Sequence, residues 1–276
     1  MKASIGGYAR AESVPHALSL LGEADGVGRI LAGGQSLIAA LNLGVSAGDM
    51  LVDITGIETL RGATLDGDRL VIGALTRHGD IARDPLIAEH APLLAAAAPL
   101  IAHDAIRNRG TIGGSLAHAD PAAEYPACVL ALDATLVLEG PAGRREVAAE
   151  DFFLGLFETA RADEEILTAI LIPCARPGDR HVIREAARRA GDYALAGLAV
   201  VRREGRHRIG AFGLDDRPVL CAGAMAKWDA GDVDGMIAAL AKDIDPPSDT
   251  QASASYRRHL AGVLLRRIAA ELGEAQ

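Results

Sequence analysis

The sequence predicts an α+β protein of one large or two modest domains, and three observations lead to this fold class. The chain has 276 residues, 50% of them hydrophobic, which is enough to bury a sizeable core. Strand and helix patterns are mixed along the whole chain. The composition changes at residues 173–177, between two prolines, and we place a domain boundary there.

The first fifty-odd residues predict two helices that alternate with two short strands. Ser13 is the expected N-cap of the first helix, because a serine side chain can accept a hydrogen bond from the open first turn. Ser36 is expected to cap the second helix, which ends at Gly44. The predicted helices are 13–21 and 36–43, and the predicted strands are 29–32 and 50–54.

A longer mixed region leads up to the boundary. Gly140 and Gly143 lie between two strand patterns, which indicates a β-hairpin. The polar stretch 103–109 leads into a second glycine turn at 110–115. We expect strands at 70–74, 134–139, 145–147 and 166–172, and helices at 92–102 and 122–132.

The segment after the boundary predicts two strands and a long final helix. The strands are expected at 196–202 and 208–213, and the helix at 254–272. One side of this helix carries an apolar stripe. Its four arginines fall mostly on the other side, which we interpret as a solvated face: Arg257, Arg258, Arg266 and Arg267.

Charge and composition exclude several classes of protein. The formal net charge is −9, which is a poor match to a nucleic-acid backbone, and we expect no nucleic-acid binding. The N-terminus lacks a secretory pattern. The most apolar long run, residues 91–102, is too short to span a membrane, which takes about 20 residues. We therefore expect a cytoplasmic protein.

The three cysteines limit the chemistry of the chain. Cys128, Cys174 and Cys221 lie far apart in the sequence, in no metal-binding spacing. An iron–sulfur cluster usually takes four cysteine ligands, so we expect no cluster and no metal on this chain. We interpret the three as small buried apolar residues.

Two glycine pairs, each followed by a hydroxyl residue and a leucine, are the chemically informative feature. Gly33-Gly34 precedes Ser36-Leu37, and Gly113-Gly114 precedes Ser115-Leu116. Glycine lets the backbone approach an anion closely, and a helix N-terminus adds partial positive charge. Two such loops can hold both phosphates of a dinucleotide without a lysine. The alternative is that each pair only forms a tight turn. The chain has no Walker A loop and no complete Rossmann fingerprint.

A resemblance to a known family favours the dinucleotide. Residues 31–37 and 106–124 resemble the two FAD-binding signatures of the carbon monoxide dehydrogenase medium-subunit family, which includes the flavin domain of xanthine dehydrogenase. Residues 188–194 resemble a third signature of this family, and residues 256–260 are also similar to it. The resemblance covers essentially the whole chain. It implies an FAD domain of the vanillyl-alcohol oxidase (PCMH) type at 1–173, with subdomains at about 1–55 and 56–173, and a smaller α+β domain at 177–276.

The resemblance also implies the site residues. In the family the two glycine loops bind the FAD pyrophosphate, an acid lies near the ribityl or ring portion, and a tyrosine lies beside the isoalloxazine. The positions that carry over are Leu31, Ala32, Gly33, Gly34, Gln35, Ser36, Leu37, Thr111, Ile112, Gly113, Gly114, Ser115, Glu124, Leu167 and Tyr193. Several members have histidine where this chain has Gln35. A family lysine is replaced here by Arg184 or Glu185.

The resemblance implies a subunit that carries electrons through non-covalently bound FAD to an external acceptor, with no catalytic acid or base of its own. The molybdenum cofactor would lie on a large subunit and the 2Fe–2S clusters on a small one, in a dimer of heterotrimers. One alternative is a self-sufficient flavin oxidoreductase, for which Tyr193, His103 and His118 are the candidate acids or bases. Another is a scaffold that has lost FAD, and both intact glycine loops argue against it.

Overall fold

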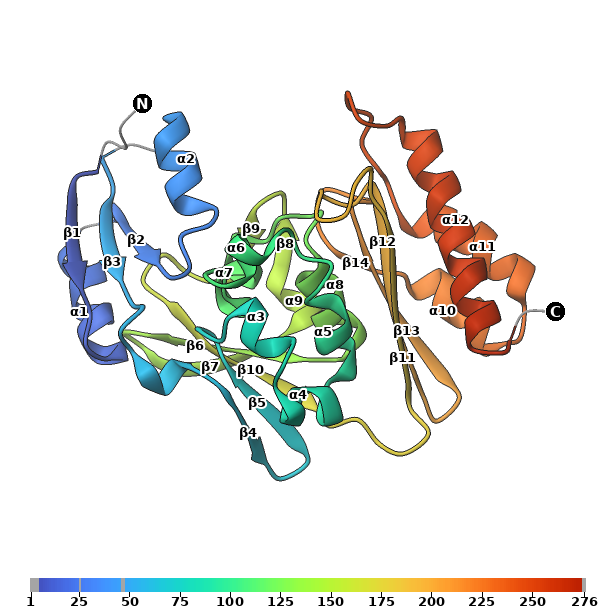
Figure 1. Cartoon of the computed structure of the whole chain (residues 1–276), viewed down its shortest axis with the longest axis horizontal. Helices are drawn as coiled ribbons and strands as arrows, with labels where there is room; N and C mark the ends of the chain where they lie inside the picture. The colour runs from blue at the N-terminus through green and yellow to red at the C-terminus, as the bar shows by residue number, and fades with distance from the viewer. Residues whose placement is uncertain (1–4, 25, 46–47, 275–276) are drawn as a thin grey trace.

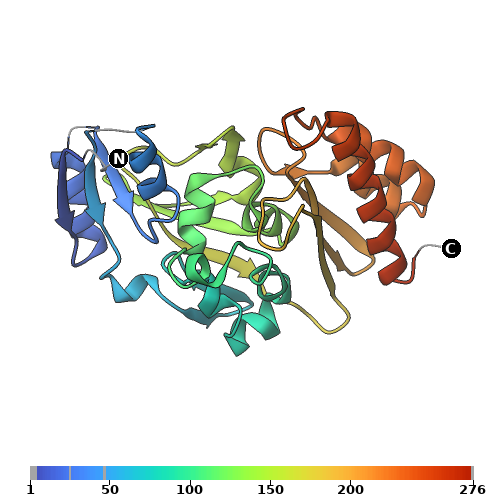
Figure 2. The ribbon, with the colours of Figure 1, turned by 45° about the horizontal axis from the view of Figure 1, so that its top comes forward.

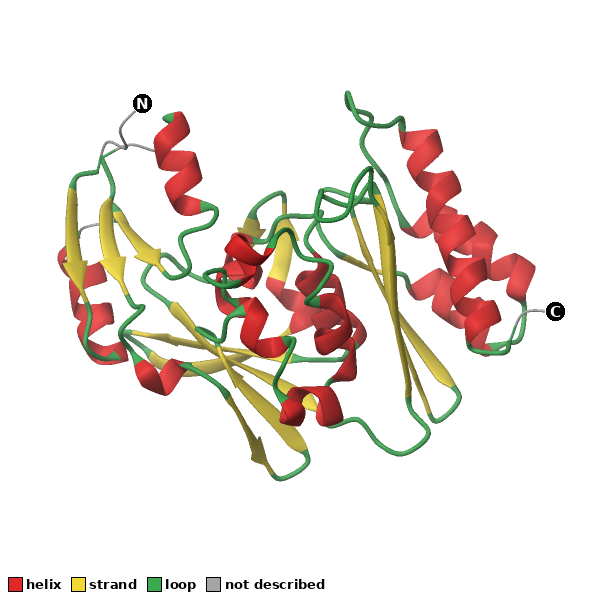
Figure 3. Cartoon of the chain, in the orientation of Figure 1, coloured by secondary structure: helices red, strands yellow, loops and turns green. Residues whose placement is uncertain are grey.

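The structure is a computed structural model that describes residues 5–24, 26–45 and 48–274. Three sheets lie in chain order across the molecule, with the C-terminal helices on the outer side of the third (Figure 1). The turned view in Figure 2 shows the same order. Helices and strands are mixed in every part (Figure 3), so the predicted α+β class is confirmed.

The first sheet is parallel and has the strand order β1-β3-β2. Its strands are β1 (Gly7–Arg10), β2 (Gly28–Leu31) and β3 (Met50–Asp53). Helix α1 (Val14–Glu23) packs against it, and Ser13 caps this helix as predicted, accepting a hydrogen bond from the backbone N–H of His16. Helix α2 (Leu37–Leu43) follows β2, as expected.

Helix α2 ends as predicted but does not begin as predicted. Gly44 ends the helix in a left-handed conformation (φ 73°), as predicted. Ser36, however, makes no capping hydrogen bond through its side chain. Its backbone has φ −102° and ψ −53°, whereas a capping serine normally has an extended backbone. The capping prediction for Ser36 is therefore wrong, and its hydroxyl is left for other contacts.

The second sheet is antiparallel, with the order β4-β5-β10-β6-β7. A short helix η1 (Glu58–Leu60) leads into it. The strands are β4 (Ala63–Asp66), β5 (Arg69–Gly73), β6 (Thr135–Gly140), β7 (Gly143–Ala148) and β10 (Ile166–Pro173). The predicted hairpin is confirmed as β6–β7, with Gly143 at φ 101° in its turn.

Short helices and one small hairpin accompany this sheet. They are α3 (His78–Ile81), α4 (Pro85–His90), α5 (Pro92–Ala97), α6 (Asp104–Arg107), α7 (Ile112–His118), α8 (Glu124–Ala131), α9 (Ala149–Phe152), β8 (Phe153–Gly155) and β9 (Glu158–Thr159). The helix expected at 92–102 is shorter than predicted, because Pro99 cannot continue it. The polar stretch 103–109 contains α6. The predicted second glycine turn at 110–115 is in fact mostly the first part of α7.

The third sheet lies between two cores. Its order is β11-β12-β13-β14, with β11 (Arg180–Ala186), β12 (Ala196–Arg203), β13 (Arg206–Phe212) and β14 (Val219–Leu220). Leu198 and Val200 of β12 belong to the C-terminal core, whereas Ala199 and Val201 belong to the core of the second sheet. Alternate side chains of a strand point to opposite faces, so this strand is buried on both.

Helices cover the two faces of the third sheet. Helices α10 (Ala222–Asp229), α11 (Val233–Asp243) and α12 (Ala254–Glu271) lie on the outer side, and α8 packs against β12 and β13 on the other (Figure 1). Arg257 of α12 corrects the prediction of a wholly solvated arginine face. It is only 5% exposed and donates to the carbonyl oxygens of Leu195 and Gly213 and to Asp249. In the described residues, no helix is long and apolar enough to cross a membrane.

Candidate functional site

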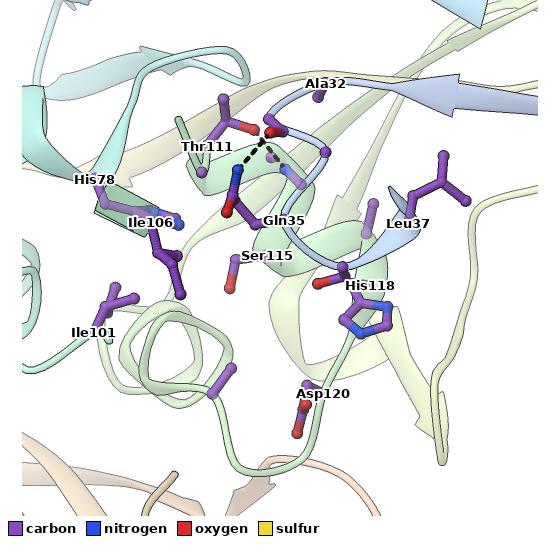
Figure 4. Close-up of a pocket in the computed structure, with 18 of the residues that line it drawn as sticks. Ala32, Gln35, Leu37, His78, Ile101, Ile106, Thr111, Ser115, His118 and Asp120 are labelled. Atoms are coloured by element: carbon purple, nitrogen blue, oxygen red, sulfur yellow. Dashed lines mark hydrogen bonds between the residues drawn. The ribbon is translucent and has the colours of Figure 1, made fainter. Parts of the chain in front are cut away.

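Loops and helices that accompany all three sheets meet around one pocket of about 500 Å³, which we call the main pocket. Its lining combines the loop after β2, the beginning of α7, part of β10 and the loop between β11 and β12. Figure 4 shows Gln35, Ser115, His118 and Asp120 around this space. Segments that are distant in sequence therefore form one site.

Most of the predicted site residues line the main pocket. They are Ala32, Gly33, Gly34, Gln35, Ser36, Leu37, Thr111, Gly113, Gly114, Ser115, Glu124, Leu167 and Tyr193. The lining does not include Leu31 or Ile112. Leu31 is the last residue of β2, and the Ile112 side chain is fully buried in the core of the second sheet.

The first glycine loop offers hydrogen-bond donors to the pocket. Within the described part of the chain, four consecutive backbone N–H groups have no protein acceptor, those of Gly33, Gly34, Gln35 and Ser36. Gly34 has a left-handed backbone (φ 72°), which favours glycine at this position of the loop. The Gln35 side chain donates to the carbonyl of Gly33 at 3.1 Å and so braces the loop (Figure 4).

The second glycine pair contributes close packing rather than free backbone donors. The N–H groups of Ile112 and Gly113 already donate to Thr76 and Ala74, and the Gly114 N–H donates to Thr111 Oγ1 at 3.1 Å. A Cβ atom on Gly113 would lie 2.7 Å from the carbonyl oxygen of Ala74, so only glycine fits there. The hydroxyl of Ser115 lines the pocket and has no partner among the described residues.

The two glycine loops also meet each other. A Cβ atom on Gly33 would lie 2.7 Å from the Cα atom of Gly110 and closer still to the carbonyl oxygen of Arg109. A bridge between Arg77 and Thr111 and a 3.0 Å hydrogen bond from the His78 N–H to Gly110 fix the second loop from behind. The first and second sheets are therefore joined at this point.

Two histidines of the pocket, His78 and His118, are poor sources of positive charge. Burial, followed by the nearby charge of Arg107, lowers the pKa of His78 to about 4. Burial also lowers the pKa of His118, whose ring lies 5.0 Å from that of Phe157. His103 lines the pocket at its exposed rim. Sequence reasoning missed His78, because a long-range contact with Gly110 brings it here and no local signal marks it.

A carboxyl group that titrates near neutral pH lies in the wall of the pocket. Glu124 is 8% exposed, and burial, helped by the charges of Glu185 and Asp120, raises its pKa to about 8. Burial raises the pKa of Glu185 itself to about 7. One Glu185 carboxylate oxygen is buried and has no hydrogen-bond partner in the described structure.

The alternation along β11 separates Arg184 and Glu185, the two candidates for the position where the resemblance expects a lysine. Arg184 pairs with Glu271 of α12 at 2.6 Å, on the outer face of the sheet. Glu185 faces the opposite side, toward Glu124. An acid rather than a base therefore lies behind this wall of the pocket.

Tyr193 reaches the pocket from the loop between β11 and β12. The residue is 68% exposed overall, yet its pKa is raised by burial of the hydroxyl and then by the charge of Asp120. Gly191 has φ 84°, and a Cβ atom on it would lie 2.8 Å from the carbonyl oxygen of Ala102. This close approach holds the β11–β12 loop of the third sheet against the segment between α5 and α6.

Comparison with known proteins agrees with these features. Residues 3–175 match the model of the FAD binding domain in molybdopterin dehydrogenase, and residues 181–272 match that of the CO dehydrogenase flavoprotein C-terminal domain. The carbon monoxide dehydrogenase medium chain of Hydrogenophaga pseudoflava is 41% identical over 73% of this chain and 70% of its own. The nicotine 6-hydroxylase medium subunit of Paenarthrobacter nicotinovorans is 36% identical over 96% of both.

A solved structure is similar along the whole length. It is the carbon monoxide dehydrogenase from Hydrogenophaga pseudoflava that lacks the Mo-pyranopterin moiety of the molybdenum cofactor. The TM-score is 0.94, with 34% sequence identity and coverage of 100% of both chains. Both parts of the chain thus have the same arrangement in that protein.

Proposed function

The chain belongs to the family of FAD-binding subunits of molybdopterin dehydrogenases, and on this premise we propose its function. It is the flavoprotein subunit of a heteromeric molybdenum hydroxylase. It takes electrons from iron–sulfur clusters on a partner subunit and passes them through FAD to an external acceptor. The single observation that carries this function is the row of unpaired N–H groups at Gly33 to Ser36, opposite the beginning of α7.

The residues of the main pocket fit FAD. A pyrophosphate brings two negative charges and several acceptor oxygens, and the first glycine loop offers four N–H donors for them. The Ser115 hydroxyl is a further donor. We assign the pyrophosphate to Ala32–Ser36 and Thr111–Ser115, with Leu31, Leu37 and Ile112 supporting these loops. Glu124 and Leu167 are assigned to the ribityl and ring portion, and Tyr193 to the isoalloxazine.

FAD supplies one- and two-electron redox chemistry when it is bound. The chain's own residues bind the dinucleotide, orient its ring and exclude water from part of it. We assign no catalytic acid or base. Burial lowers the pKa of His78 and of His118, so each is a weaker base than an ordinary histidine. The similar proteins are named as medium chains and medium subunits, which favours a subunit.

The finer organisation is also part of this proposal. We infer a large molybdenum-binding partner and a small iron–sulfur partner, assembled as a dimer of heterotrimers in the cytoplasm. We divide the chain into an FAD domain at 1–173 and a C-terminal domain at 177–276. The gap between β10 and β11, at residues 174–179, supports this division.

Affinity purification of the chain with its partners tests the function. The purified complex should contain about one FAD per copy of this chain, together with iron and molybdenum. The chain alone, after addition of FAD and gel filtration, should retain flavin but no iron. A flavin-containing chain that oxidises a substrate without any partner would contradict the proposal, and so would a chain that binds no flavin.

A further inference from the structure

A second cavity lies behind the junction of the two glycine loops. Its volume is about 300 Å³, and we call it the arginine cavity because Arg61, Arg77 and Arg109 line it. Thr55 and Asn108 add neutral hydrogen-bonding groups, and no acidic residue is part of the lining. It shares Ala32, Gly33, Leu75 and Thr111 with the main pocket, so the same segments form a wall of both.

Two of the three guanidinium groups lack an internal partner. Within the described part of the chain, the exposed side chains of Arg77 and Arg109 form no hydrogen bond and no ion pair. Arg61 is more constrained, since it donates to the Thr55 carbonyl at 2.6 Å and lies 3.4 Å from Glu58. The Glu58 carboxylate is itself 81% exposed. Positive charge therefore gathers in this cavity, although the chain as a whole has a net charge of −9.

The backbone that carries these arginines is held firmly. Arg77 is bridged to Thr111, and the Arg109 N–H donates to Ile106 at 3.1 Å while the Arg109 carbonyl packs against Gly33. Side chains that extend from fixed backbone into a common cavity lose less freedom on binding a ligand than side chains on a loose loop. The backbone positions from which these donors extend are therefore fixed.

The chemistry of the donors identifies the class of ligand. A guanidinium group presents a planar fork of N–H donors that matches phosphate or carboxylate oxygens, and it keeps its charge at any physiological pH. Three such groups exceed what one carboxylate can use, whereas a phosphate offers more oxygens and about two negative charges. Thr55 and Asn108 can complete the hydrogen bonding of a tetrahedral oxyanion.

We propose that the arginine cavity is a second anion site, separate from the FAD pocket, that binds a phosphate group. The phosphate is either free or carried by a nucleotide, and the site does not depend on the proposed function.

Calorimetry on the FAD-saturated full chain tests this site, with inorganic phosphate as the probe and ionic strength held constant with chloride. Wild-type protein should bind phosphate saturably. The double variant Arg77→Gln/Arg109→Gln should bind it at least about tenfold more weakly, because two charge-assisted contacts are lost. Arg83→Gln is the matched control, since Arg83 is exposed, pairs with Asp80 and lies outside the cavity.

FAD absorbance and thermal unfolding of the same samples show whether each variant is folded and loaded, so a failure of the FAD assignment is seen separately. A second titration uses ADP. Tighter binding of ADP than of phosphate identifies a nucleotide as the source, and equal or weaker binding identifies the free ion. The proposal is overturned if wild-type protein shows no saturable phosphate binding, if the double variant binds like wild type, or if the double variant loses FAD together with phosphate.

Discussion

Gly33 and Arg109 lie backbone against backbone, so that the carbonyl of Arg109 occupies the space where a Cβ atom on Gly33 would be. The two residues are 76 positions apart, and they belong to the loops that follow β2 and α6, respectively. This contact lies where the main pocket adjoins the arginine cavity, since Gly33 lines both. Glycine is required at position 33 because any side chain would collide with this backbone.

Gly33→Ala is expected to separate the two glycine loops and to lower FAD affinity by at least about tenfold, since the added methyl group collides with backbone atoms that cannot move aside. Flavin retained after gel filtration measures the effect. Gly22→Ala is the matched control, because Gly22 lies in α1 with nothing within 4 Å of its Cβ position. Full retention of FAD by Gly33→Ala would show that the loop contact is dispensable.

Glu124→Gln is expected to flatten the pH dependence of stability in the FAD-free chain. Glu124 has a folded-state pKa of about 8, above the ordinary value of 4.5, so the folded state favours its protonated form. The resulting stability is fully present below the ordinary pKa and is lost as pH rises through about 8. Glu185, with a pKa of about 7, acts in the same window and the same direction.

Thermal and denaturant unfolding between about pH 5 and about pH 8 measure this effect. Wild type should lose on the order of 3 kcal/mol of unfolding free energy through Glu124, and Glu124→Gln should lose correspondingly less. Glu164→Gln, at an exposed position, should behave like wild type. Parallel curves for wild type and Glu124→Gln would contradict the assignment.

Tyr193→Ala is expected to leave FAD bound but to change the flavin environment. The glycine loops hold the pyrophosphate, whereas an aromatic ring beside the isoalloxazine stacks on it or shields it from solvent. Flavin fluorescence and the rate of reoxidation by oxygen should therefore change several-fold. Tyr256→Ala is the control, since Tyr256 is 49% exposed on α12. If only the melting temperature fell, Tyr193 would be a packing residue.

Elemental analysis of the FAD-loaded chain is expected to find no stoichiometric iron or zinc. Its three cysteines are free and separated, and Cys128 and Cys221 are buried. Among the described residues, no group of three or more histidine, cysteine or acidic side chains could hold a metal ion. Two iron atoms per chain in the absence of partners would refute this prediction.

Local signals made much of the fold predictable. The β6–β7 hairpin follows from Gly140 and Gly143 between two strand-forming segments, and the end of α2 follows from Gly44, because both depend on residues close in sequence. Helix α7 was not predictable in this way. A glycine pair disfavours a helix locally, and here tertiary contacts with Thr76 and Ala74 hold the first turn.

The candidate site was likewise predictable only where it depends on local sequence. The two glycine loops were visible as motifs, but which of them supplies free N–H donors depends on hydrogen-bond acceptors in the loop that follows β5. The placement of Glu185 behind Glu124 required the strand alternation of β11 and its docking on the second sheet's helices. Contacts between distant segments place His78 at the pocket and form the arginine cavity, so neither could be predicted from local sequence.

The most direct test of the electron path uses the purified heteromer in two forms, one with FAD-loaded wild-type chain and one with Gly33→Ala chain from which the weakly held FAD has been removed by gel filtration. Each is supplied with electrons from the substrate or from a limiting chemical reductant, and cluster reduction and acceptor reduction are followed in the same sample. The account predicts that the iron–sulfur clusters become reduced in both forms, while electrons reach the acceptor only when FAD is present. Transfer to the acceptor at the wild-type rate without FAD would contradict it.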